Sequence, residues 1–212
     1  MSYAFHDIKH IVEPYLDDLP AHSARQEDHY EHLKAIFLRC RHYNIRLNPH
    51  KCIFCVETGW LLGLIISKDG IKIDPLKVQA IIDLPPPSTL LQLQSLQGKT
   101  NFLCWFIHNY VEISKGFTRL LKKDIPFLWY EEAQCSFEAL KEALANAPLL
   151  YHPNYTRDFT LYLAASHATI CMVLAQEVDD HQEHMVYYLS KGLSGPEWNY
   201  SHVEKLALAL VI

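Results

Sequence analysis

Apolar residues recur at helical spacing between residues 27 and 43, the clearest periodic signal in the first part of the chain. The recurring side chains are Leu33, Ile36, Phe37 and Cys40. Intervals of three and four residues place them on one face of a helix, with charged residues between them. Two apolar runs come earlier, and they predict strands over 8–13 and 19–22 that flank a turn.

Shorter strand patterns follow this helix. They predict strands over 52–57, 60–66 and 71–73. Thr58 and Gly59 are the expected hairpin turn between the first two of these. Asp74 and Pro75 then predict a helix start, because aspartate caps helix N-termini and proline suits the first helical position.

A run of three prolines lies near the middle of the chain. Pro85 to Pro87 predict a stiff, extended linker. Ser88 is expected to cap a helix that ends near Lys99, and more helices are expected over 101–109, 113–122 and 131–145. The pattern then predicts strands over 159–163, 170–176 and 185–189, a charged turn over 177–184 and a final helix over 201–212.

Composition narrows the possible classes of protein. Half of the 212 residues are hydrophobic, which is enough for a sizeable core and one or two domains. No apolar run approaches the roughly 20 residues of a membrane span, and the N-terminus does not resemble a secretory signal. We therefore expect an intracellular protein of cytoplasm or nucleus that does not bind membranes.

The six cysteines form no disulfide framework, and they are interpreted as reduced, mostly buried thiols. The spacing of Cys52 and Cys55 would suit zinc. However, Ile53 and Phe54 between them favour an apolar strand, and no second pair lies at finger spacing. A polar helix entrance, rather than a ligand set, is the interpretation for three histidines: His22, His29 and His32.

Charge is distributed unevenly around the net value of −5. Residues 88–123 carry five basic side chains against Glu112 alone, whereas the segment after them is strongly acidic. The basic side chains are Lys99, Lys115, Arg119, Lys122 and Lys123. The aromatic side chains among them are Phe102, Trp105, Phe106, Tyr110 and Phe117. This combination suits a surface that follows a phosphate backbone, although an ordinary amphipathic helix with solvated lysines would look the same.

The sequence Tyr15-Leu16-Asp17-Asp18 carries the most specific chemistry. Adjacent side chains on a regular strand point in opposite directions, but both can reach one metal at the tip of a tight hairpin. Paired carboxylates there are what two Mg²⁺ ions need to activate an attacking oxygen and stabilise a leaving one. An aspartate-rich surface turn is the simpler alternative.

Several further motifs, in order, are similar to one family. They span 46–54, 61–67, 70–78, 85–88 and 102–107. Together with the Tyr15 to Asp18 motif, they resemble the reverse transcriptase of gypsy-type LTR retrotransposons over almost the whole chain. The stretches 161–166 and 204–210 resemble the plant branch of that family.

This resemblance implies an α+β fold in four parts. The C-terminal part of a polymerase palm, a hairpin plus a helix, would span 1–87, and a helical thumb 88–123. A connection would span 124–157, and a truncated RNase H-like βββα unit 158–212. The family's activity is RNA-directed DNA synthesis with RNase H, it uses Mg²⁺, and its partners are an RNA/DNA hybrid or primer–template and the rest of Pol.

The resemblance also assigns site residues. Asp17 and Asp18 match the paired metal-binding aspartates, Tyr15 would lie beside the primer end, and Lys51 matches a proton donor to the leaving pyrophosphate. Leu61, Leu62 and Gly63 match the hairpin that grips the primer. The basic residues of 88–123 match the thumb surface that holds the duplex.

Departures from the family pattern argue against catalysis by this chain. The family's third palm aspartate lies upstream of the pair, and no matching segment is present here. Ala164 stands where the RNase H domain has a catalytic aspartate, while Glu204 matches the catalytic glutamate or simply favours a helix dipole. Cys104, Trp105 and His108 replace basic residues and a proline. We expect neither polymerisation nor RNA cleavage; a nucleic-acid-binding remnant and a domesticated protein-interaction module are the alternatives.

Overall fold

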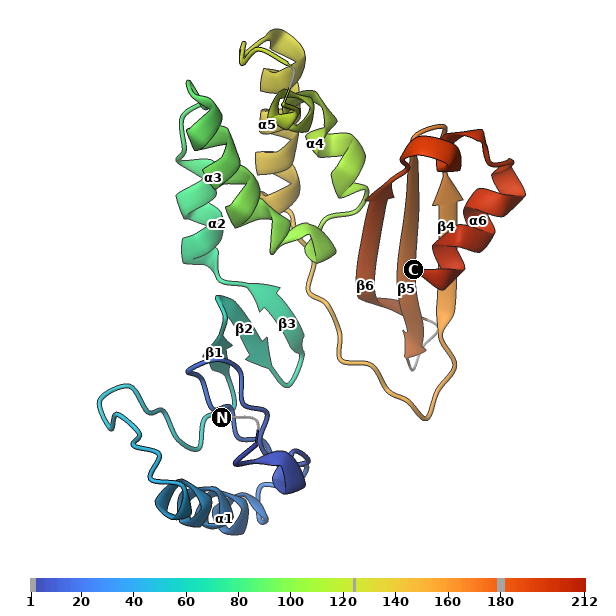
Figure 1. Cartoon of the computed structure of the whole chain (residues 1–212). Helices are drawn as coiled ribbons and strands as arrows, with labels where there is room; N and C mark the ends of the chain where they lie inside the picture. The colour runs from blue at the N-terminus through green and yellow to red at the C-terminus, as the bar shows by residue number, and fades with distance from the viewer. Residues whose placement is uncertain (1–2, 124, 179–181) are drawn as a thin grey trace. The chain divides into compact units, whose positions relative to one another are not determined.

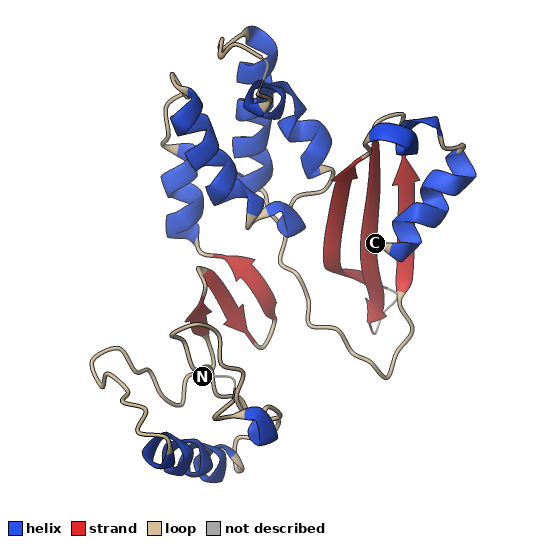
Figure 2. Cartoon of the chain, viewed as in Figure 1, coloured by secondary structure: helices blue, strands red, loops and turns tan. Residues whose placement is uncertain are grey.

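The computed structural model describes residues 3–123, 125–178 and 182–212 (Figure 1). It combines helices and strands, so the expected α+β class is confirmed (Figure 2). The chain forms two compact units, Met1–Leu62 and Gly63–Ile212. Within the described residues, no helix is long and apolar enough to cross a membrane.

The first unit is built on helix α1 (His29–His42). A 3-10 helix, η1 (His6–Ile8), precedes a hairpin. The strands predicted over 8–13 and 19–22 do not form, and a single bridge between Val12 and Ala21 joins these two segments. Its small core contains Ala4, Phe5, Ile11, Val12, Ile36 and Cys40. An ion pair from Arg39 to Asp7 ties α1 to η1, and it lowers the pKa of the Asp7 carboxyl.

The strands predicted over 52–57 and 60–66 were wrong: the first does not form, and the second is divided by a turn at residues 62 and 63. No strand forms over 52–57, where Ile53 and Phe54 are exposed and Cys55 has a positive φ of 54°. Strand β1 (Gly59–Leu61) includes the glycine that was expected to turn. The chain turns instead at Leu62 and Gly63, which have φ values of 54° and 79°.

The second unit begins with strands β2 (Leu64–Ser67) and β3 (Gly70–Ile73), which pair antiparallel. Helix α2 (Pro75–Ile82) follows, and the Leu76 N–H donates to the Asp74 carboxylate at 3.0 Å, as the predicted cap requires. Helix α3 (Leu90–Asn101) is capped by Thr89 rather than Ser88. Ser88 instead donates twice to the Gln92 side chain.

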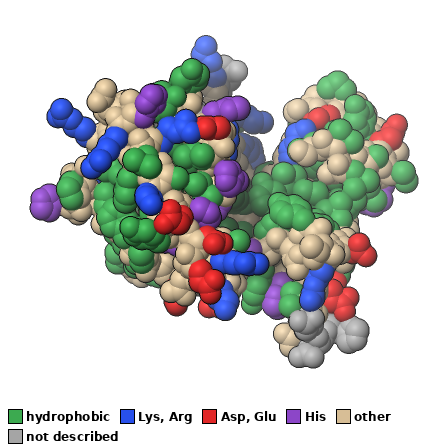
Figure 3. All heavy atoms as spheres, turned by 90° about the horizontal axis from the view of Figure 1, so that it is seen from below, with side chains coloured by type: hydrophobic (Ala, Val, Ile, Leu, Met, Phe, Trp, Pro, Cys, Tyr) green, Lys and Arg blue, Asp and Glu red, His purple; other side chains and the backbone are tan. Residues whose placement is uncertain are grey.

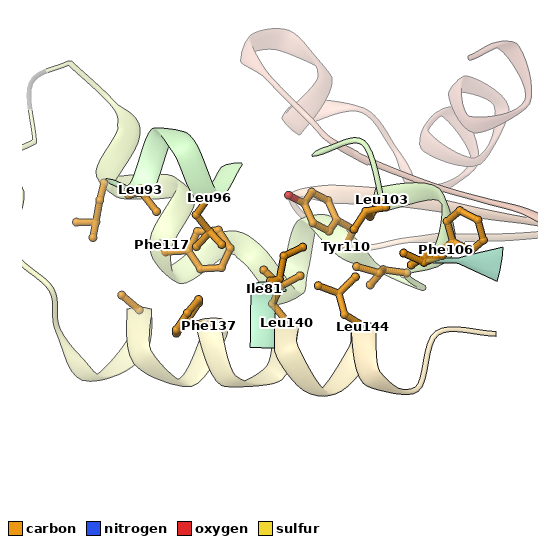
Figure 4. Close-up of a cluster of buried hydrophobic side chains, with 14 of the residues drawn as sticks. Ile81, Leu93, Leu96, Leu103, Phe106, Tyr110, Phe117, Phe137, Leu140 and Leu144 are labelled. Atoms are coloured by element: carbon orange, nitrogen blue, oxygen red, sulfur yellow. The ribbon is translucent and has the colours of Figure 1, made fainter. Parts of the chain in front are cut away.

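A helical core follows, formed by α2, α3, α4 (Tyr110–Thr118) and α5 (Glu131–Ala145) (Figure 4). Short 3-10 helices, η2 (Cys104–Phe106) and η3 (Arg119–Leu121), replace parts of the predicted helices. Phe137, Leu140 and Leu144 of α5 are almost fully buried, as their spacing predicted. One buried polar pair, Thr100 and Tyr110, bonds at 3.0 Å, and burial raises the pKa of Tyr110.

The last part is the sheet β4–β5–β6, formed by β4 (Thr160–Ala165), β5 (Thr169–Val178) and β6 (Gln182–Gly192) in antiparallel order. Residues 179–181 of the predicted charged turn lie outside the described residues. The 3-10 helix η5 (Gly195–Asn199) and helix α6 (His202–Val211) follow. Figure 1 shows α6 beside this sheet, and Ile170, Leu193 and Ala209 form the small core there.

Candidate metal centre and nucleic-acid interface

Asp17 and Asp18 lie at the tip of a tight hairpin. The Asp18 N–H donates to the Tyr15 carbonyl at 2.8 Å, and the Tyr15 N–H donates to the Asp18 carbonyl at 3.0 Å. Leu16 turns the chain with a φ of 49°, an unusual conformation for a residue with a branched side chain. The hairpin continues through Val12, which is bridged to Ala21. Both carboxylates are exposed at this tip, beside half-exposed Tyr15.

These residues fit Mg²⁺ only in part. Mg²⁺ takes six oxygen ligands in nearly ideal octahedral geometry, and a two-metal site needs carboxylates that bridge or flank both ions. Asp17 and Asp18 come from a single turn. Over 3–123, 125–178 and 182–212, no three His, Cys, Asp or Glu side chains gather closely enough to hold a metal. Asp17 and Asp18 alone would therefore supply only part of a Mg²⁺ site.

Lys51 lies in an exposed turn of the first unit. Its N–H donates to the Asn48 carbonyl at 3.0 Å, and the Asn48 side chain accepts from the His50 N–H at 3.1 Å. The asparagine therefore shapes this turn through local hydrogen bonds. Lys51 is exposed, so the structure presents it as a surface cation.

Gly63 begins the second unit, directly before β2. The Asp74 N–H donates to its carbonyl oxygen at 3.2 Å, which joins the glycine to the cap of α2. A Cβ at this position would overlap the end of the Lys77 side chain, and the φ of 79° is itself unfavourable for other residues. The glycine thus leaves room for the Lys77 side chain and accommodates the positive φ, whereas neighbouring Leu62 adopts a positive φ at a steric cost.

The basic side chains of 88–123 are all exposed. They come from α3, α4, η3 and the residues that follow: Lys99, Lys115, Arg119, Lys122 and Lys123. Lys115 lies 3.5 Å from Glu112, and Arg119 lies 4.0 Å from Glu132. Exposed ion pairs of this kind are worth at most about 1 kcal/mol, so they leave these cations able to bind phosphates.

Most aromatic side chains in this block are part of the core, not of a stacking surface. Phe106, Tyr110 and Phe117 are at most 5% exposed. Phe102 is 38% exposed, and the Lys77 ammonium lies 5.8 Å from its ring centre. Half-buried Trp105 packs edge-on against Phe102 and Tyr187. Most of the aromatic side chains that were expected on a surface following a phosphate backbone therefore pack inside the helical core.

Ala164 and Glu204, the two positions that the resemblance assigns to a nuclease site, have different surroundings. Ala164 is exposed on β4 and pairs with Cys171. Glu204 forms a capping box at the start of α6: its carboxylate accepts from the Ser201 N–H at 2.7 Å, and the Ser201 hydroxyl accepts from the Glu204 N–H at 3.3 Å. The bond from the Ser201 N–H lowers the pKa of Glu204. This carboxylate has a structural task, which the Ser-x-x-Glu spacing could have signalled.

The cysteines and histidines differ in part from expectation. Cys40 and Cys171 are buried, Cys52 and Cys104 are half-buried, and Cys55 and Cys135 are exposed, so the description "mostly buried" was wrong. The Ser23 hydroxyl lies 2.9 Å from His29 Nδ1 and 2.7 Å from His32 Nδ1. This polar cluster at the start of α1 agrees with the interpretation as a helix entrance.

Sequence reasoning missed one carboxylate, that of Glu112. Its Oε1 accepts from the Thr169 hydroxyl at 3.0 Å and lies 3.5 Å from the Ser166 hydroxyl. The N–H of the neighbouring Val111 donates to the Ser190 hydroxyl at 3.2 Å. These bonds join the start of α4 to β5 and β6, across 54 or more residues of sequence, and no local pattern could signal them.

Figure 3 shows hydrophobic side chains at the surface among basic and histidine side chains. The first unit has a groove of about 660 Å³ along α1, lined by Leu33, Phe37, Leu38, Leu47 and Phe54. Lys34 and Arg41 lie at the same groove. The ring of Phe37 packs edge-on against Phe54, 5.8 Å between centres.

Comparisons with known proteins identify the family. Residues 129–212 match the model of the RNase H-like domain found in reverse transcriptase. Over 93% of its length, the chain is 31% identical to the retrovirus-related Pol polyprotein from transposon opus of Drosophila melanogaster. It is 34% identical, also over 93%, to that from transposon 297 of the same organism. The chain is a segment of a retrotransposon Pol polyprotein. This Pol segment spans about a fifth of those relatives, 21% and 18% of their lengths.

Solved structures show the same fold. The Pol segment superposes with a TM-score of 0.81 on a foamy viral protease-reverse transcriptase in complex with an RNA/DNA hybrid. The match covers 99% of the segment and 28% of that chain, at 21% identity. A second structure of that protein, with double-stranded DNA, gives a TM-score of 0.79. The α+β fold that the resemblance implied is therefore that of a reverse transcriptase region.

Proposed function

We propose that this Pol segment is the duplex-holding part of a reverse transcriptase from a gypsy-type LTR retrotransposon of the plant branch. By itself it would bind an RNA/DNA hybrid or primer–template without copying or cleaving it. The observation that carries the proposal is the set of exposed basic side chains over residues 99–123. A phosphate backbone binds such a surface through release of its counterions, independently of sequence.

The helical core supports this role because it holds the cations on a rigid base. Phe117 and Leu120 are buried on the inner side of α4 and η3, while Lys115 and Arg119 are exposed. The likeness to structures solved with a hybrid and with double-stranded DNA agrees with a nucleic-acid partner. The motifs at 161–166 and 204–210 are the reason for assigning the plant branch.

The chemistry of the two candidate catalytic centres argues for binding without turnover. Asp17 and Asp18 are the residues that would hold Mg²⁺ in a complete polymerase, but two side chains from a single turn do not complete a two-metal site. Ala164 has no metal-binding atom. The Glu204 carboxylate accepts a hydrogen bond from the Ser201 N–H at the N-terminus of α6. Lys51 would act on a leaving pyrophosphate only where such a site is complete.

Salt-dependent binding tests the proposal. The fluorescence anisotropy of a labelled RNA/DNA hybrid is measured between about 50 and 200 mM salt, where phosphate contacts dominate the change in affinity. We expect a steep negative slope of log K against log salt. The double variant Lys122→Gln, Lys123→Gln should lower the steepness by about 1 for each phosphate that is no longer neutralised, equally for all sequences.

A matched control separates the basic block from net charge. Lys9→Gln, Lys34→Gln removes two exposed lysines of the first unit and changes net charge equally. It should leave the slope close to that of the unmodified protein. An affinity that ignores salt, or an equal effect of both double variants, would contradict the proposal.

A further inference from the structure

The segment between α5 and β4 contacts two different strands within two residues. The Ile71 N–H of β3 donates to the Leu150 carbonyl at 2.7 Å, and the Leu150 N–H donates back to Ile71 at 2.9 Å. The next N–H, that of Tyr151, donates to the Met185 carbonyl of β6 at 2.8 Å. One extended stretch is therefore hydrogen-bonded to the β2–β3 hairpin and to the β4–β5–β6 sheet, which is called the RNase H-like sheet below because it lies within residues 129–212.

Side chains of the same stretch repeat these two attachments. The His152 Nε2 lies 2.8 Å from the Ser67 carbonyl oxygen, at the end of β2. The Tyr151 ring stacks on His184 of β6, 3.7 Å between ring centres. Leu150 itself is 3% exposed and belongs to the helical core. Backbone and side chains thus attach the hairpin and the sheet to one short segment.

Gly70 makes the first attachment possible. A Cβ built at Gly70 would overlap the Leu150 carbonyl oxygen and lie 3.2 Å from its carbon. Both obstacles are backbone atoms held by the Ile71–Leu150 pair, so they cannot swing aside as a flexible side chain would. The φ of 146° adds strain for any residue other than glycine.

We propose that residues 149–152 act as a clasp that fixes the β2–β3 hairpin to the RNase H-like sheet, with Gly70 as the positioning residue. The consequence for nucleic acid rests on the proposed function. The hairpin starts at Gly63, which matches the primer-gripping loop by resemblance. The clasp would hold that loop in a set orientation toward the sheet.

Hydrogen exchange of the whole chain tests the clasp, with Gly70→Ala and the control Gly98→Ala. A Cβ at Gly98, in α3, meets no atom within 4 Å. Gly70→Ala should speed exchange both in 70–73 and in 149–152, including the Tyr151 amide, while α5 stays protected. Gly98→Ala should not speed exchange in any of these three regions. Faster exchange confined to the hairpin would overturn the clasp.

A second variant covers the case in which Gly70→Ala does not fold. His152→Ala removes only the contact to Ser67 on an exposed side chain. It should also raise exchange in both 64–73 and 149–152, and unchanged exchange in these two peptides would refute the clasp.

Hybrid binding supplies a readout that simple destabilisation does not give. With the clasp weakened, affinity should fall about fivefold, the lower range of coupling between sites, while the salt slope stays unchanged because no cation is removed. A changed slope would contradict the positioning role. If the unmodified chain does not bind hybrid, the proposed function fails, and hydrogen exchange still decides whether the clasp exists.

Discussion

The same substitution, glycine to alanine, should change stability in opposite directions at two helical positions of the second unit. Gly98 lies in α3, and an added Cβ meets no atom within 4 Å. Gly116 lies in α4 where it crosses α5, and an added Cβ would lie 2.5 Å from both the Glu132 carbonyl oxygen and the Ser136 hydroxyl. The backbone of Gly116 also accepts from the Tyr130 hydroxyl at 2.9 Å.

The magnitudes follow from helix propensity and packing. Alanine is about 1 kcal/mol more favourable than glycine in an exposed helix interior, so Gly98→Ala should stabilise by roughly that amount. At Gly116 the same gain is opposed by overpacking of about 1–3 kcal/mol. Two hydrogen bonds of the Gly116 backbone, to Ser136 and Tyr130, are at risk at about 1 kcal/mol each. The net result should be a loss of about 1–4 kcal/mol.

Urea unfolding, followed by circular dichroism and tryptophan fluorescence, measures both changes. Gly98→Ala should shift the midpoint upward and Gly116→Ala downward, with similar slopes against urea. A Gly116→Ala protein as stable as the Gly98→Ala protein would refute the close packing of α4 on α5.

Four further predictions concern the core, a helix cap, the pH dependence of stability and the thiols. Phe117→Ala should lower the free energy of unfolding by about 3–5 kcal/mol in the same assay, because the ring is fully buried. Ser201→Ala should cost about 1 kcal/mol by removing the cap. The pKa of Glu204 is lowered in the folded protein, so its ionised carboxylate stabilises the fold fully above the ordinary pKa of 4.5. This stabilisation is lost as pH falls through the lower pKa of the folded state. In a Glu204→Gln protein, the melting temperature should therefore depend less on pH in this range. Burial raises the pKa of three thiols, so mass spectrometry should find slow alkylation of Cys40, Cys104 and Cys171 and fast alkylation of exposed Cys55 and Cys135.

Features set by neighbouring residues were predictable from the sequence. Asp74 and Pro75 start α2 because the cap and the missing proline N–H act within one turn of helix. The limits of α5 follow from its periodic apolar face, which is buried as expected. Where two adjacent residues could play the same part, the prediction chose the wrong one: Thr89, not Ser88, caps α3.

Features set by tertiary packing were not predictable. The turn lies at Leu62 and Gly63 rather than at Gly59, and it places a leucine in a conformation that sequence statistics disfavour. The aromatics of the basic block are mostly core because α3, α4 and α5 pack around them. The pairing of Leu150 with Ile71 joins positions 79 residues apart. The sequence around Gly70 therefore contains no pattern that explains why this residue must be glycine.

Binding and turnover measured in one sample test the central claim most directly. The chain is mixed with Mg²⁺, all four dNTPs and a labelled DNA primer on an RNA template. Anisotropy reports binding, and a gel reports primer and RNA lengths. The account predicts a bound hybrid with both strands unchanged. Primer extension that Asp17→Asn abolishes, or RNA cleavage that Glu204→Gln abolishes, would contradict it.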